Sequence, residues 1–565
     1  MKLFERMIVE RLYFWMEREG VVQNWQAGFQ RLRGTEEQVL RLVQGIQDGW
    51  EERKPLSTIA VTLDCSKAYD RVWRVRLLER LMDDGVPACM VRWFACFLEG
   101  RQARVRVGMG AGKWRRFQEG LPQGAVSSPA LFLLYANEWL GLQKEGVEYG
   151  GFADDLALWT TGRRMGEVRA RMQAALEGVD EWAKRNKITL NPSKCECCVF
   201  ARSAGERAMR MGLKVAGREI ETRGELKYLG VVVDQGLTFA RQVELVSEKV
   251  RRRSRVLRAL AGRDWGWDRE DLLRVFRACV DSLFWHAAAA WMPWCCSSLL
   301  SKLERAQRVG LRVVAGLTKT TPTDLVHVET GVPPVRVTGR VRAVWAWERM
   351  VRGREGDPGR RLAERHVPRR LKANKGWREQ AREVGLRVCG AEREGLCWIR
   401  PAPWSLAGGG SLEIFPELLT STSTEDPDTR RRAFEETKDR RGLFEAVLFT
   451  DGSVTGGLGE GGAACVGWVR DEEVVRSTVT GRVCSSFAAE SRALGLAVEC
   501  LRARKPASAI IFSDSQALLR LLQLGGHGCG EFLGSVVRGL AEVKEGTGTR
   551  VVLQCGGHVL SLIHI

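Results

Sequence analysis

The sequence contains no uninterrupted run of about 18 apolar residues, the length that a membrane-spanning helix requires. Its first residues, MKLFERMIVERLYFW, predict an amphipathic helix with acidic groups, which is unlike a signal or transit peptide. The 16 cysteines include no CxxC pair, and Cys195, Cys197 and Cys198 have no companion His or Cys pair at zinc-finger spacing. We therefore expect reduced, mostly buried thiols in an intracellular protein without a membrane span, with a metal site at this cluster as the alternative.

Acidic residues are scarce relative to basic ones, and the formal net charge is +19. From Leu443 to the end lie 11 of the 88 Lys and Arg residues and 12 of the 69 Asp and Glu residues, so the first 442 residues carry +20. A basic body with a nearly neutral tail is typical of a protein that binds a polyanion along most of its length. The alternative is an Arg-rich chain whose charges are simply solvated.

The order of predicted elements indicates an α+β protein of several domains, because 565 residues exceed the usual size of about 100–200 residues per domain. Residues 57–63 (STIAVTL) predict a buried strand, and residues 151–159 predict two strands that meet at an acidic turn. The other predictions are helices at 74–98 with a Gly-Val-Pro break, a hairpin at 103–118, helices at 128–142 and 165–187, a strand at 227–233, helices from about 240 to 400, a linker within 407–427, and then strand-strand-strand-helix-strand-helix.

Two acidic positions at the ends of apolar strands are the strongest chemical signal. Asp64 ends the strand AVTLD, and Asp154 and Asp155 lie in FADD between apolar runs. Carboxylates in such places are costly unless a cation holds them, and oxygen ligands suit Mg²⁺. Two ions roughly 4 Å apart can activate a 3′ hydroxyl and stabilise a pyrophosphate leaving group. A turn or helix cap is the alternative for either position alone.

Five segments in this order resemble the palm motifs of reverse transcriptases from non-LTR (LINE-type) retrotransposons. They are VTLDCSKAYD at 61–70, EGLPQGAVSSP at 119–129, FADD at 152–155, LNPSKC at 190–195 and YLG at 228–230. An upstream segment, QAGFQ at 26–30, resembles the family's Gln-x-Gly-Phe-Arg, but Gln30 stands where the family usually has Arg. This departure puts a direct phosphate role of position 30 in doubt.

The resemblance assigns roles by position. It implies that Asp64, Asp154 and Asp155 are the catalytic, metal-binding carboxylates. Tyr69 would lie under the sugar and exclude a 2′ hydroxyl, with a core aromatic as the alternative. The remaining substrate-binding assignments are Gln123 on the nucleotide or template, Lys194 as proton donor to the pyrophosphate or a plain surface lysine, and Tyr228, Leu229 and Gly230 as the grip on the primer strand.

The helical region after these motifs resembles the thumb of the family. Residues 249–260 (KVRRRSRVLRAL) place several Arg on a helix with Val and Leu at core spacing, so they would neutralise phosphates without reading sequence. Residues 340–400 mix Arg with Trp345, Trp347, Trp377 and Trp398. They predict either a nucleic-acid surface or a helical scaffold with Trp in its core.

The last part of the chain resembles ribonuclease H. Asp451 follows a strand, Glu490 lies near the start of a helix and Asp514 ends another strand, in the family's order. The resemblance implies a second site for two Mg²⁺ ions and in-line hydrolysis. The family's fourth acid has no counterpart after VVLQCGGH at 551–558, so a scaffold-only domain is the alternative.

We therefore predict an α+β right-hand polymerase with partial fingers, palm and helical thumb, followed by an α/β ribonuclease H-like domain. The expected boundaries are 1–235 for fingers and palm, 236–340 for the thumb, 341–440 for a basic connection and linker, and 441–565 for the ribonuclease H-like domain. The implied function is RNA-directed DNA polymerase with degradation of RNA in RNA/DNA hybrids. A dead remnant that only binds nucleic acid, or an LTR-type polymerase, is the alternative.

The implied cofactor is Mg²⁺, with two ions per active site and Mn²⁺ as a substitute. The implied partners are an RNA template, a DNA primer or target, an RNA/DNA hybrid and deoxynucleoside triphosphates, in a ribonucleoprotein of cytoplasm and nucleus. Oligomeric state is left open. In the family an Arg-Pro motif precedes the first helix, so we expect a natural protein longer at both ends and little polymerase activity from residues 1–565 alone.

Overall fold

The computed structural model describes residues 2–138, 144–262, 265–365, 376–389, 412–418, 444–454, 458–470, 472–513, 515–523, 531–547 and 549–555. The chain divides into two compact units. The first comprises Met1–Glu5, Gly20–Val351 and Glu355–Val384, and the second comprises Arg6–Glu19, Arg352–Arg354 and Gly385–Ile565. Within the described residues, no helix is both long and apolar enough to cross a bilayer.

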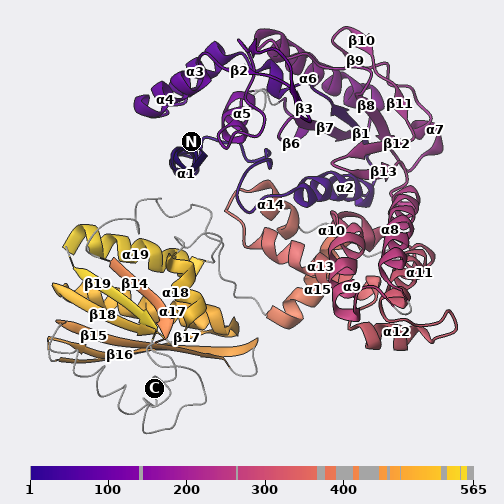
Figure 1. Ribbon diagram of the computed structural model, residues 1–565. Coiled ribbons are helices and arrows are strands. Elements are labelled where there is room, and N and C mark those ends of the chain that lie inside the picture. Colours follow the sequence, from indigo (N-terminus) through magenta and orange to yellow (C-terminus); the bar gives the residue numbers. More distant parts are fainter. Residues whose placement is uncertain are drawn as a thin grey trace. The chain divides into compact units, whose positions relative to one another are not determined.

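A five-stranded sheet forms the centre of the first unit (Figure 1), with strand order β11-β8-β1-β7-β6. The strands are β1 (Ser57–Leu63), β6 (Val147–Phe152), β7 (Asp155–Gly162), β8 (Glu196–Phe200) and β11 (Thr222–Arg223). Both neighbours of β1 run antiparallel to it. Because β1 is buried on both faces, its sequence is a nearly continuous β-branched apolar run, and the strand predicted at 57–63 is confirmed.

Two amphipathic helices cover this sheet. Helix α2 (Thr35–Glu51) packs on β1, β6 and β7, and α6 (Met165–Arg185) packs on the same three strands from the other side (Figure 1). In α6 the buried positions Val168, Met172, Leu176 and Val179 recur at three- and four-residue spacing, which places them on one face. The helix predicted at 165–187 is confirmed.

The other elements around the sheet are short. They are α3 (Arg74–Asp83), α4 (Ala88–Leu98), α5 (Ser128–Ala136), α7 (Ala204–Arg207), a 3₁₀ turn (Tyr69–Arg71), β2 (Gln102–Ala103), β3 (Arg106–Val107), β4 (Gly110–Ala111), β5 (Arg115–Arg116), β9 (Lys214–Val215), β10 (Arg218–Glu219), β12 (Glu225–Tyr228) and β13 (Val231–Asp234). The single strand predicted at 227–233 is wrong. It is a hairpin of β12 and β13, because Leu229 and Gly230 take positive φ values of 45° and 84° and reverse the chain.

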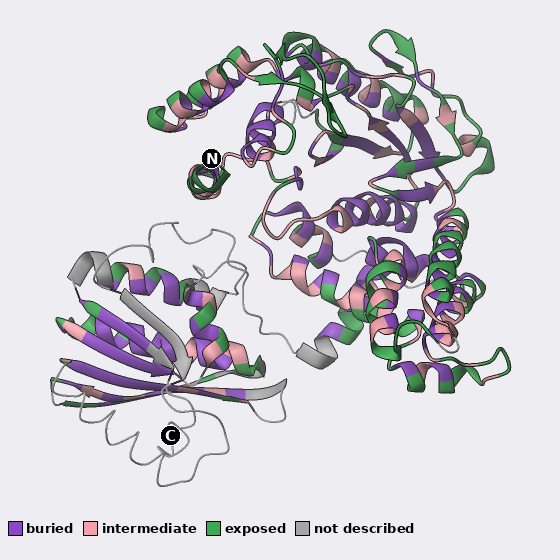
Figure 2. Cartoon of the chain, viewed as in Figure 1, coloured by how far each residue is buried: buried purple, intermediate pink, exposed green. Residues whose placement is uncertain are grey.

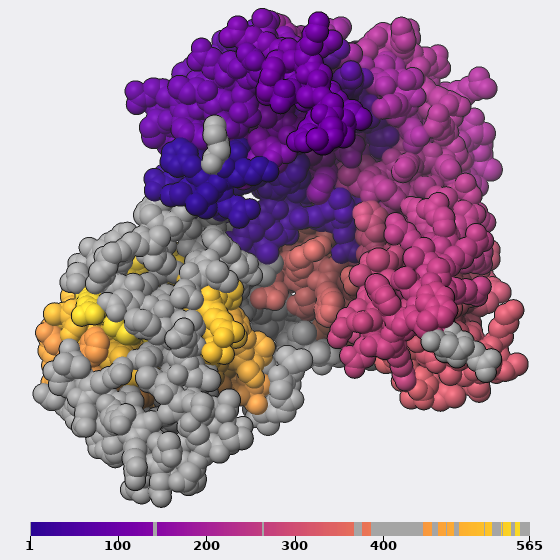
Figure 3. All heavy atoms as spheres, in the orientation of Figure 1, coloured from indigo at the N-terminus to yellow at the C-terminus, as the bar shows by residue number. Residues whose placement is uncertain are grey.

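A helical region completes the first unit. Its elements are α8 (Ala240–Leu260), α9 (Arg269–Val275), a π-helical turn (Phe276–Val280), 3₁₀ turns (Asp281–Phe284, Met292–Trp294), α10 (Ala288–Trp291), α11 (Ser297–Val314), α12 (Thr323–Thr330), α13 (Val335–Val351), α14 (Pro358–Glu364) and α15 (Trp377–Cys389). One hydrophobic cluster runs from α2 through α8 and α11 to α15. Trp347 and Trp377 are buried in it, whereas Trp345 is 65% exposed, so two of the four tryptophans predicted for the Arg/Trp region are core residues, and Trp398 lies outside the described residues. In the space-filling view, side chains close the spaces between these ribbons (Figure 3).

The second unit contains a six-stranded sheet of order β14-β19-β18-β15-β16-β17. Its elements are α1 (Lys2–Glu19, of which Arg6–Glu19 belong here), β14 (Leu412–Leu418), β15 (Ala446–Val454), β16 (Leu458–Val469), β17 (Glu472–Ser485), α17 (Ser486–Arg504), β18 (Ser508–Ser513), α18 (Gln516–Gln523), α19 (Glu531–Thr547) and β19 (Arg550–Cys555). Strands β15, β16 and β17 form an antiparallel meander, and β18 and β19 add parallel to β15. This is the order predicted for a ribonuclease H-like domain. Strand β14, within the predicted linker, extends the sheet by a sixth strand.

Candidate active site

The pairing of β1 with β7 brings the three predicted palm carboxylates to one end of the sheet. Leu63 pairs with Leu156, so Asp64 and Asp155 are the next residues of the two strands in the same ladder. Asp154 lies in the tight turn between β6 and β7, where Phe152 pairs with Asp155. Residues about 90 positions apart in the chain therefore become neighbours because adjacent antiparallel strands end together.

The electrostatics of these carboxylates are unfavourable without a cation. Burial raises the pKa of Asp154, and the charge of Asp64 raises it further. Burial also raises the pKa of Asp155, with Asp154 and Asp64 adding to the shift. The buried Oδ2 atom of Asp64 has no hydrogen-bond partner, and the Lys194 ammonium lies 3.6 Å from it. Partly desolvated acids that repel one another form a site for positive charge.

The donor set fits a hard divalent cation. Carboxylate oxygens are the ligands that Mg²⁺ prefers, usually one or two of them together with waters and substrate phosphates. Burial raises the pKa of the neighbouring Cys195 thiol to about 11, which makes it a poorer ligand for such an ion than the carboxylates. In the part of the chain that the structure describes, no three or more His, Cys, Asp or Glu side chains are already gathered as a metal cage. The oxygen donors thus suit an ion that arrives with phosphates.

The side chain of Gln26 hydrogen-bonds the backbone of the acidic turn. The sequence motifs assigned no role to this residue. Its side chain is fully buried, and its Oε1 atom accepts hydrogen bonds from the backbone N–H groups of Ala153 (3.1 Å) and Gly28 (2.9 Å). Its Nε2 atom donates to the Ala153 carbonyl at 3.3 Å. Ala153 has a φ of 59°, a left-handed conformation that is strained for a residue with a side chain. One amide thus fixes both polar groups of the residue before Asp154.

Gly28 allows this close approach. A Cβ atom at position 28 would lie 2.2 Å from the Ala153 nitrogen. Because that nitrogen belongs to the backbone, no change of side-chain conformation could remove the clash. The resemblance of QAGFQ to a family segment was the available signal for this contact. The pattern alone could not have shown it, because the contact joins residues 26 and 153 across the sheet edge.

The LNPSKC loop lies beside Asp64. The Asn191 backbone N–H donates to the Asp64 carbonyl at 2.9 Å, and Cys65 forms an isolated bridge with Leu190. These contacts bring Lys194 to the carboxylate of Asp64. Its side chain is 66% exposed, so the ammonium can also reach a ligand in front of the acids.

Tyr69 and Gln123 lie on two segments that are joined by a backbone hydrogen bond. The Tyr69 ring stacks on Phe132 with a centroid separation of 4.6 Å, and the Tyr69 carbonyl accepts from the Leu121 N–H at 2.8 Å. The Gln123 side chain is exposed and donates to Asp70 at 3.0 Å. The structure thus brings together the predicted sugar-contacting and nucleotide-contacting residues.

The YLG segment is a turn whose tyrosine points inward. Tyr228 is 2% exposed and donates its hydroxyl proton to the Gly150 carbonyl at 3.1 Å. The Leu229 carbonyl is 2.8 Å from Nε2 of His286, and a Cβ on Gly230 would lie 3.0 Å from the same nitrogen. The tyrosine therefore anchors the turn, and Gly230 is the exposed residue of this segment.

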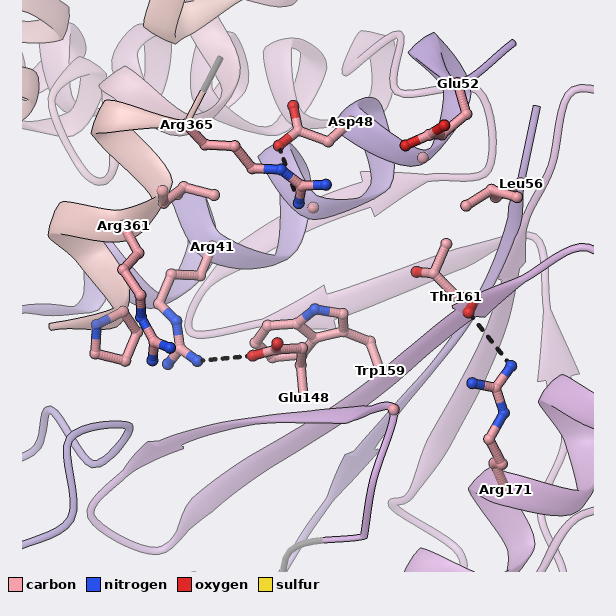
Figure 4. A pocket seen from close by; sticks show the side chains of 15 residues that line it. Arg41, Asp48, Glu52, Leu56, Glu148, Trp159, Thr161, Arg171, Arg361 and Arg365 are labelled. Carbon is pink, nitrogen blue, oxygen red and sulfur yellow. Dashed lines mark hydrogen bonds and ion pairs between the residues drawn. The ribbon is translucent and has the colours of Figure 1, made fainter. Parts of the chain in front are cut away.

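A cavity of about 430 Å³ lies away from these residues, between α2, β7 and α14 (Figure 4). Arg41 lies over the Trp159 ring at 5.5 Å and 3.4 Å from Glu148, and burial lowers the pKa of Arg41. Asp48 in its wall is paired with Arg378 at 2.8 Å. No residue assigned to catalysis or substrate binding lines this cavity, and its buried charges compensate one another, so we assign it a structural role.

In the second unit the structure brings together two of the three predicted ribonuclease H acids. Asp451 lies on β15, and Glu490 lies on α17 and is 7% exposed. A Cβ at Gly452 would lie 2.2 Å from the Glu490 nitrogen, so the strand touches the helix backbone there. Thr450 pairs with Ser513 in β18. Asp514, the next residue, lies outside the described residues.

Comparison with known proteins shows what the first part of the chain is similar to. Residues 1–233 match the family described as reverse transcriptase (RNA-dependent DNA polymerase). The chain is 28% identical over 259 residues to the RNA-directed DNA polymerase from mobile element jockey of Drosophila melanogaster, covering 44% of this chain and 27% of the relative. It is 29% identical over 255 residues to the probable RNA-directed DNA polymerase from transposon X-element of the same species, covering 44% and 27%. The chain thus spans about a quarter of the length of these relatives.

Solved structures with a likeness to the chain fall into two groups. Ribonuclease H1 from Halobacterium salinarum NRC-1 is 19% identical, with a TM-score of 0.18, over 21% of this chain and 89% of that one. Apo telomerase from Candida tropicalis is 10% identical, with a TM-score of 0.32, over 60% of this chain and 58% of that one. With scores this low, the fold assignments rest on the strand orders described above.

Proposed function

We propose that this chain, whose residues 1–233 form a reverse transcriptase domain similar to those of non-LTR retrotransposon polymerases, copies RNA into DNA. The observation that carries the proposal is the β1–β7 register. It places Asp64 beside Asp155 and next to the Asp154 turn, with an Asp64 oxygen that lacks a hydrogen-bond partner. The repulsion between these carboxylates is not offset by any contribution to the packing of the fold, whereas a nucleotidyl-transfer site requires grouped carboxylates to bind its metal ions.

The chain's own residues would divide the work as follows. Asp64, Asp154 and Asp155 would hold two Mg²⁺ ions, or Mn²⁺ in their place. When bound, such ions lower the pKa of the primer 3′ hydroxyl and neutralise the departing pyrophosphate. Lys194 would donate a proton to the pyrophosphate, since its ammonium is exposed beside Asp64.

Substrate positioning would fall to the remaining residues. Tyr69 and Gln123 would contact the deoxynucleoside triphosphate and the template, and the Leu229–Gly230 turn would support the primer strand. The partners would be an RNA template, a DNA primer or target, and the resulting hybrid. The protein would act as a ribonucleoprotein in cytoplasm and nucleus.

Primer extension on an RNA template by the full chain tests the proposal. We expect Mg²⁺-dependent DNA synthesis by the parent, at the low rate expected above for residues 1–565 alone. Asp154→Asn and Asp64→Asn should each reduce it to less than about one hundredth, because each change removes a metal ligand. The dissociation constant for primer–template should stay nearly unchanged, because neither change removes a phosphate-binding group. Synthesis by either variant at the parent rate would refute the assignment.

A second activity, cleavage of RNA in an RNA/DNA hybrid, is proposed for residues 441–565. It is favoured by the approach of Gly452, the residue after Asp451, to the backbone of Glu490, which shows that the two elements carrying these acids touch. With Asp514 these acids would hold two Mg²⁺ ions. Release of labelled RNA fragments from a hybrid, lost in Asp451→Asn and retained in Asp154→Asn, would support it. Equal cleavage by both variants would point to a contaminating nuclease and against this site.

A further inference from the structure

Residues 101–117 form a two-stranded ribbon that projects into solvent, here called the basic ribbon. Its strands pair as β2 with β5 and as β3 with β4, and Gly108 reverses the chain with a φ of 57°. Every residue from 102 to 119 is exposed (Figure 2), so neither face of the ribbon is covered by the rest of its unit. An isolated two-stranded ribbon is at best marginally stable, so keeping one exposed needs a reason outside packing.

The ribbon carries positive charge without compensation. It contains six cations and no acidic residue; the cations are Arg101, Arg104, Arg106, Lys113, Arg115 and Arg116. Across the described parts of the chain, no carboxylate forms an ion pair with any of the six. Large apolar groups are exposed among them, including Trp114 at 60%, Phe117 at 49% and Met109 at 97%. The Arg104 guanidinium lies over the Trp114 ring at 4.8 Å.

The root of the ribbon is fixed to the polymerase site. The Arg74 guanidinium donates to four backbone carbonyls that flank the ribbon, those of Leu98 (2.7 Å), Phe117 (2.8 Å), Glu119 (3.1 Å) and Gly120 (2.9 Å). Beyond the ribbon, Gly120 N–H donates to the Val72 carbonyl and Leu121 N–H to the Tyr69 carbonyl, both at 2.8 Å. The ribbon therefore starts and ends next to the segment that carries Tyr69 and Gln123.

We propose that the basic ribbon binds the single-stranded template RNA that enters the polymerase site, an inference that rests on the proposed function. Six cations without acids select a polyanion, which disfavours a protein partner of mixed charge. Exposed aromatic rings between the cations add stacking surfaces for unpaired bases, whereas paired bases in a duplex offer none. The fixed root places these surfaces beside Tyr69 and Gln123, where an unpaired template must arrive.

Binding of the full chain to labelled RNA by fluorescence anisotropy tests the inference without catalysis. The probes are a single-stranded RNA, a blunt RNA/DNA duplex, and the same duplex with a 5′ RNA overhang. The ribbon variant is Arg104→Ala with Trp114→Ala. The matched control is Arg269→Ala with Trp267→Ala, an exposed Arg and Trp of the same unit that lie outside the ribbon.

We expect the ribbon variant to bind the single strand about 10-fold more weakly, because it can neither stack the base on Trp114 nor hold the phosphate at Arg104. The salt dependence of its binding should become less steep by about 0.7 in log–log slope for each phosphate that the variant no longer binds. Affinity gained from the overhang should disappear, and blunt-duplex affinity should stay at the parent value. The control variant should match the parent in every assay.

Several outcomes would overturn the inference. Unchanged single-strand affinity would do so, as would an equal decrease on the blunt duplex, which would indicate general binding of phosphates. A change in oligomeric state without a change in RNA affinity would assign the ribbon to a second copy of the chain. A second variant, Arg115→Glu with Arg116→Glu, must give the same ordering of probes at unchanged melting temperature. If the parent extends no primer yet the ribbon variant loses overhang affinity, the ribbon inference stands and the polymerase proposal fails.

Discussion

Ala153 shows how one residue's backbone controls the palm site. A left-handed conformation costs a residue with a Cβ atom about 1–2 kcal/mol, so it persists only where neighbours enforce it. Here the enforcement is the buried amide of Gln26, which bonds both the N–H and the carbonyl of Ala153. Since Asp154 follows directly, the position of that carboxylate depends on an uncharged, fully buried side chain. Gln26 is thus a positioning residue.

Replacing Gln26 should slow nucleotide addition without weakening nucleic-acid binding. In Gln26→Met the turn loses its two hydrogen bonds with this side chain, and a displacement of about 1 Å can cost on the order of 100-fold in rate. Because the turn would be displaced, we expect a single-turnover rate about 10- to 100-fold lower. We also expect that a higher Mg²⁺ concentration is needed for the half-maximal rate. Asn24→Ala, a change at an exposed side chain of the same loop, is the control and should keep the parent rate. Equal rates for the two variants would show that Gln26 does not position the turn.

Tyr69 should determine the choice between ribo- and deoxynucleotides. Its ring stacks on Phe132, which fixes the position of the ring and would let its edge block a bulkier sugar. Tyr69→Val removes the aromatic ring, so the ratio of ribonucleotide to deoxynucleotide incorporation should rise about 10-fold or more, as for other size-selective pockets. Tyr69→Phe keeps the stacked ring and should keep the parent ratio. An unchanged ratio in Tyr69→Val would rule out the steric role.

At the scale of elements, a buried ion pair connects helices that are far apart in the chain. Arg378 on α15 donates to both carboxylate oxygens of Asp48 on α2, at 3.1 and 2.8 Å. The two side chains are 5% and 2% exposed, so neither charge is solvated by water. Losing Arg378 therefore leaves the buried Asp48 with only the more distant Arg365, at 3.8 Å, which is worse than losing both charges together.

Arg378→Ala should lower the free energy of unfolding of the first unit by about 3 kcal/mol, the low end of the range for breaking a buried pair, because Asp48 would keep only Arg365 at 3.8 Å and a hydrogen bond from Gln44. Urea denaturation followed by tryptophan fluorescence would measure it. Arg382→Ala, an exposed position on the same helix, should change stability by less than about 0.5 kcal/mol. The double change Asp48→Asn with Arg378→Met should recover much of the stability. If the double variant is as unstable as Arg378→Ala, the pair is not the cause.

Element prediction from the sequence succeeded where pattern and length agreed. Strand β1 and helix α6 have one dominant periodicity and were placed within a few residues. It failed at 227–233, where an apolar run contains a chain reversal at Leu229 and Gly230 that leaves no change in hydrophobicity. Strand β14 was also missed, because its pairing partner β19 lies more than 100 residues later and no local pattern reports such a contact.

At the scale of the whole molecule, charge separates the two parts of the chain. Residues 1–389 hold 69 of the 88 basic and 47 of the 69 acidic residues, a net of +22, so residues 390–565 carry −3. To separate the two parts as fragments, the chain must be divided before residue 412 and not at residue 443, because β14 belongs to the sheet of the second unit. A cut at 389 keeps that sheet whole.

Binding to an RNA/DNA duplex should reside in residues 1–389 and fall steeply with salt. If six to ten phosphates are contacted, affinity should drop by about 10³–10⁵ between 50 and 200 mM salt. Residues 390–565 should bind weakly and with little salt dependence. Anisotropy titrations of the two pieces at several salt concentrations would decide. Comparable affinities and slopes would mean that net charge does not determine where nucleic acid binds.

The sequence alone predicted the candidate carboxylates of the site and determined the order of most elements that carry them. It could do so because acids at strand ends and strand or helix periodicities are local patterns. Only the tertiary structure decided that Asp64 lies beside Asp155, that Gln26 supports the turn before Asp154, and that Arg74 fixes the root of the basic ribbon. Those facts depend on strand register and on hydrogen bonds between distant segments, and no local pattern contains either.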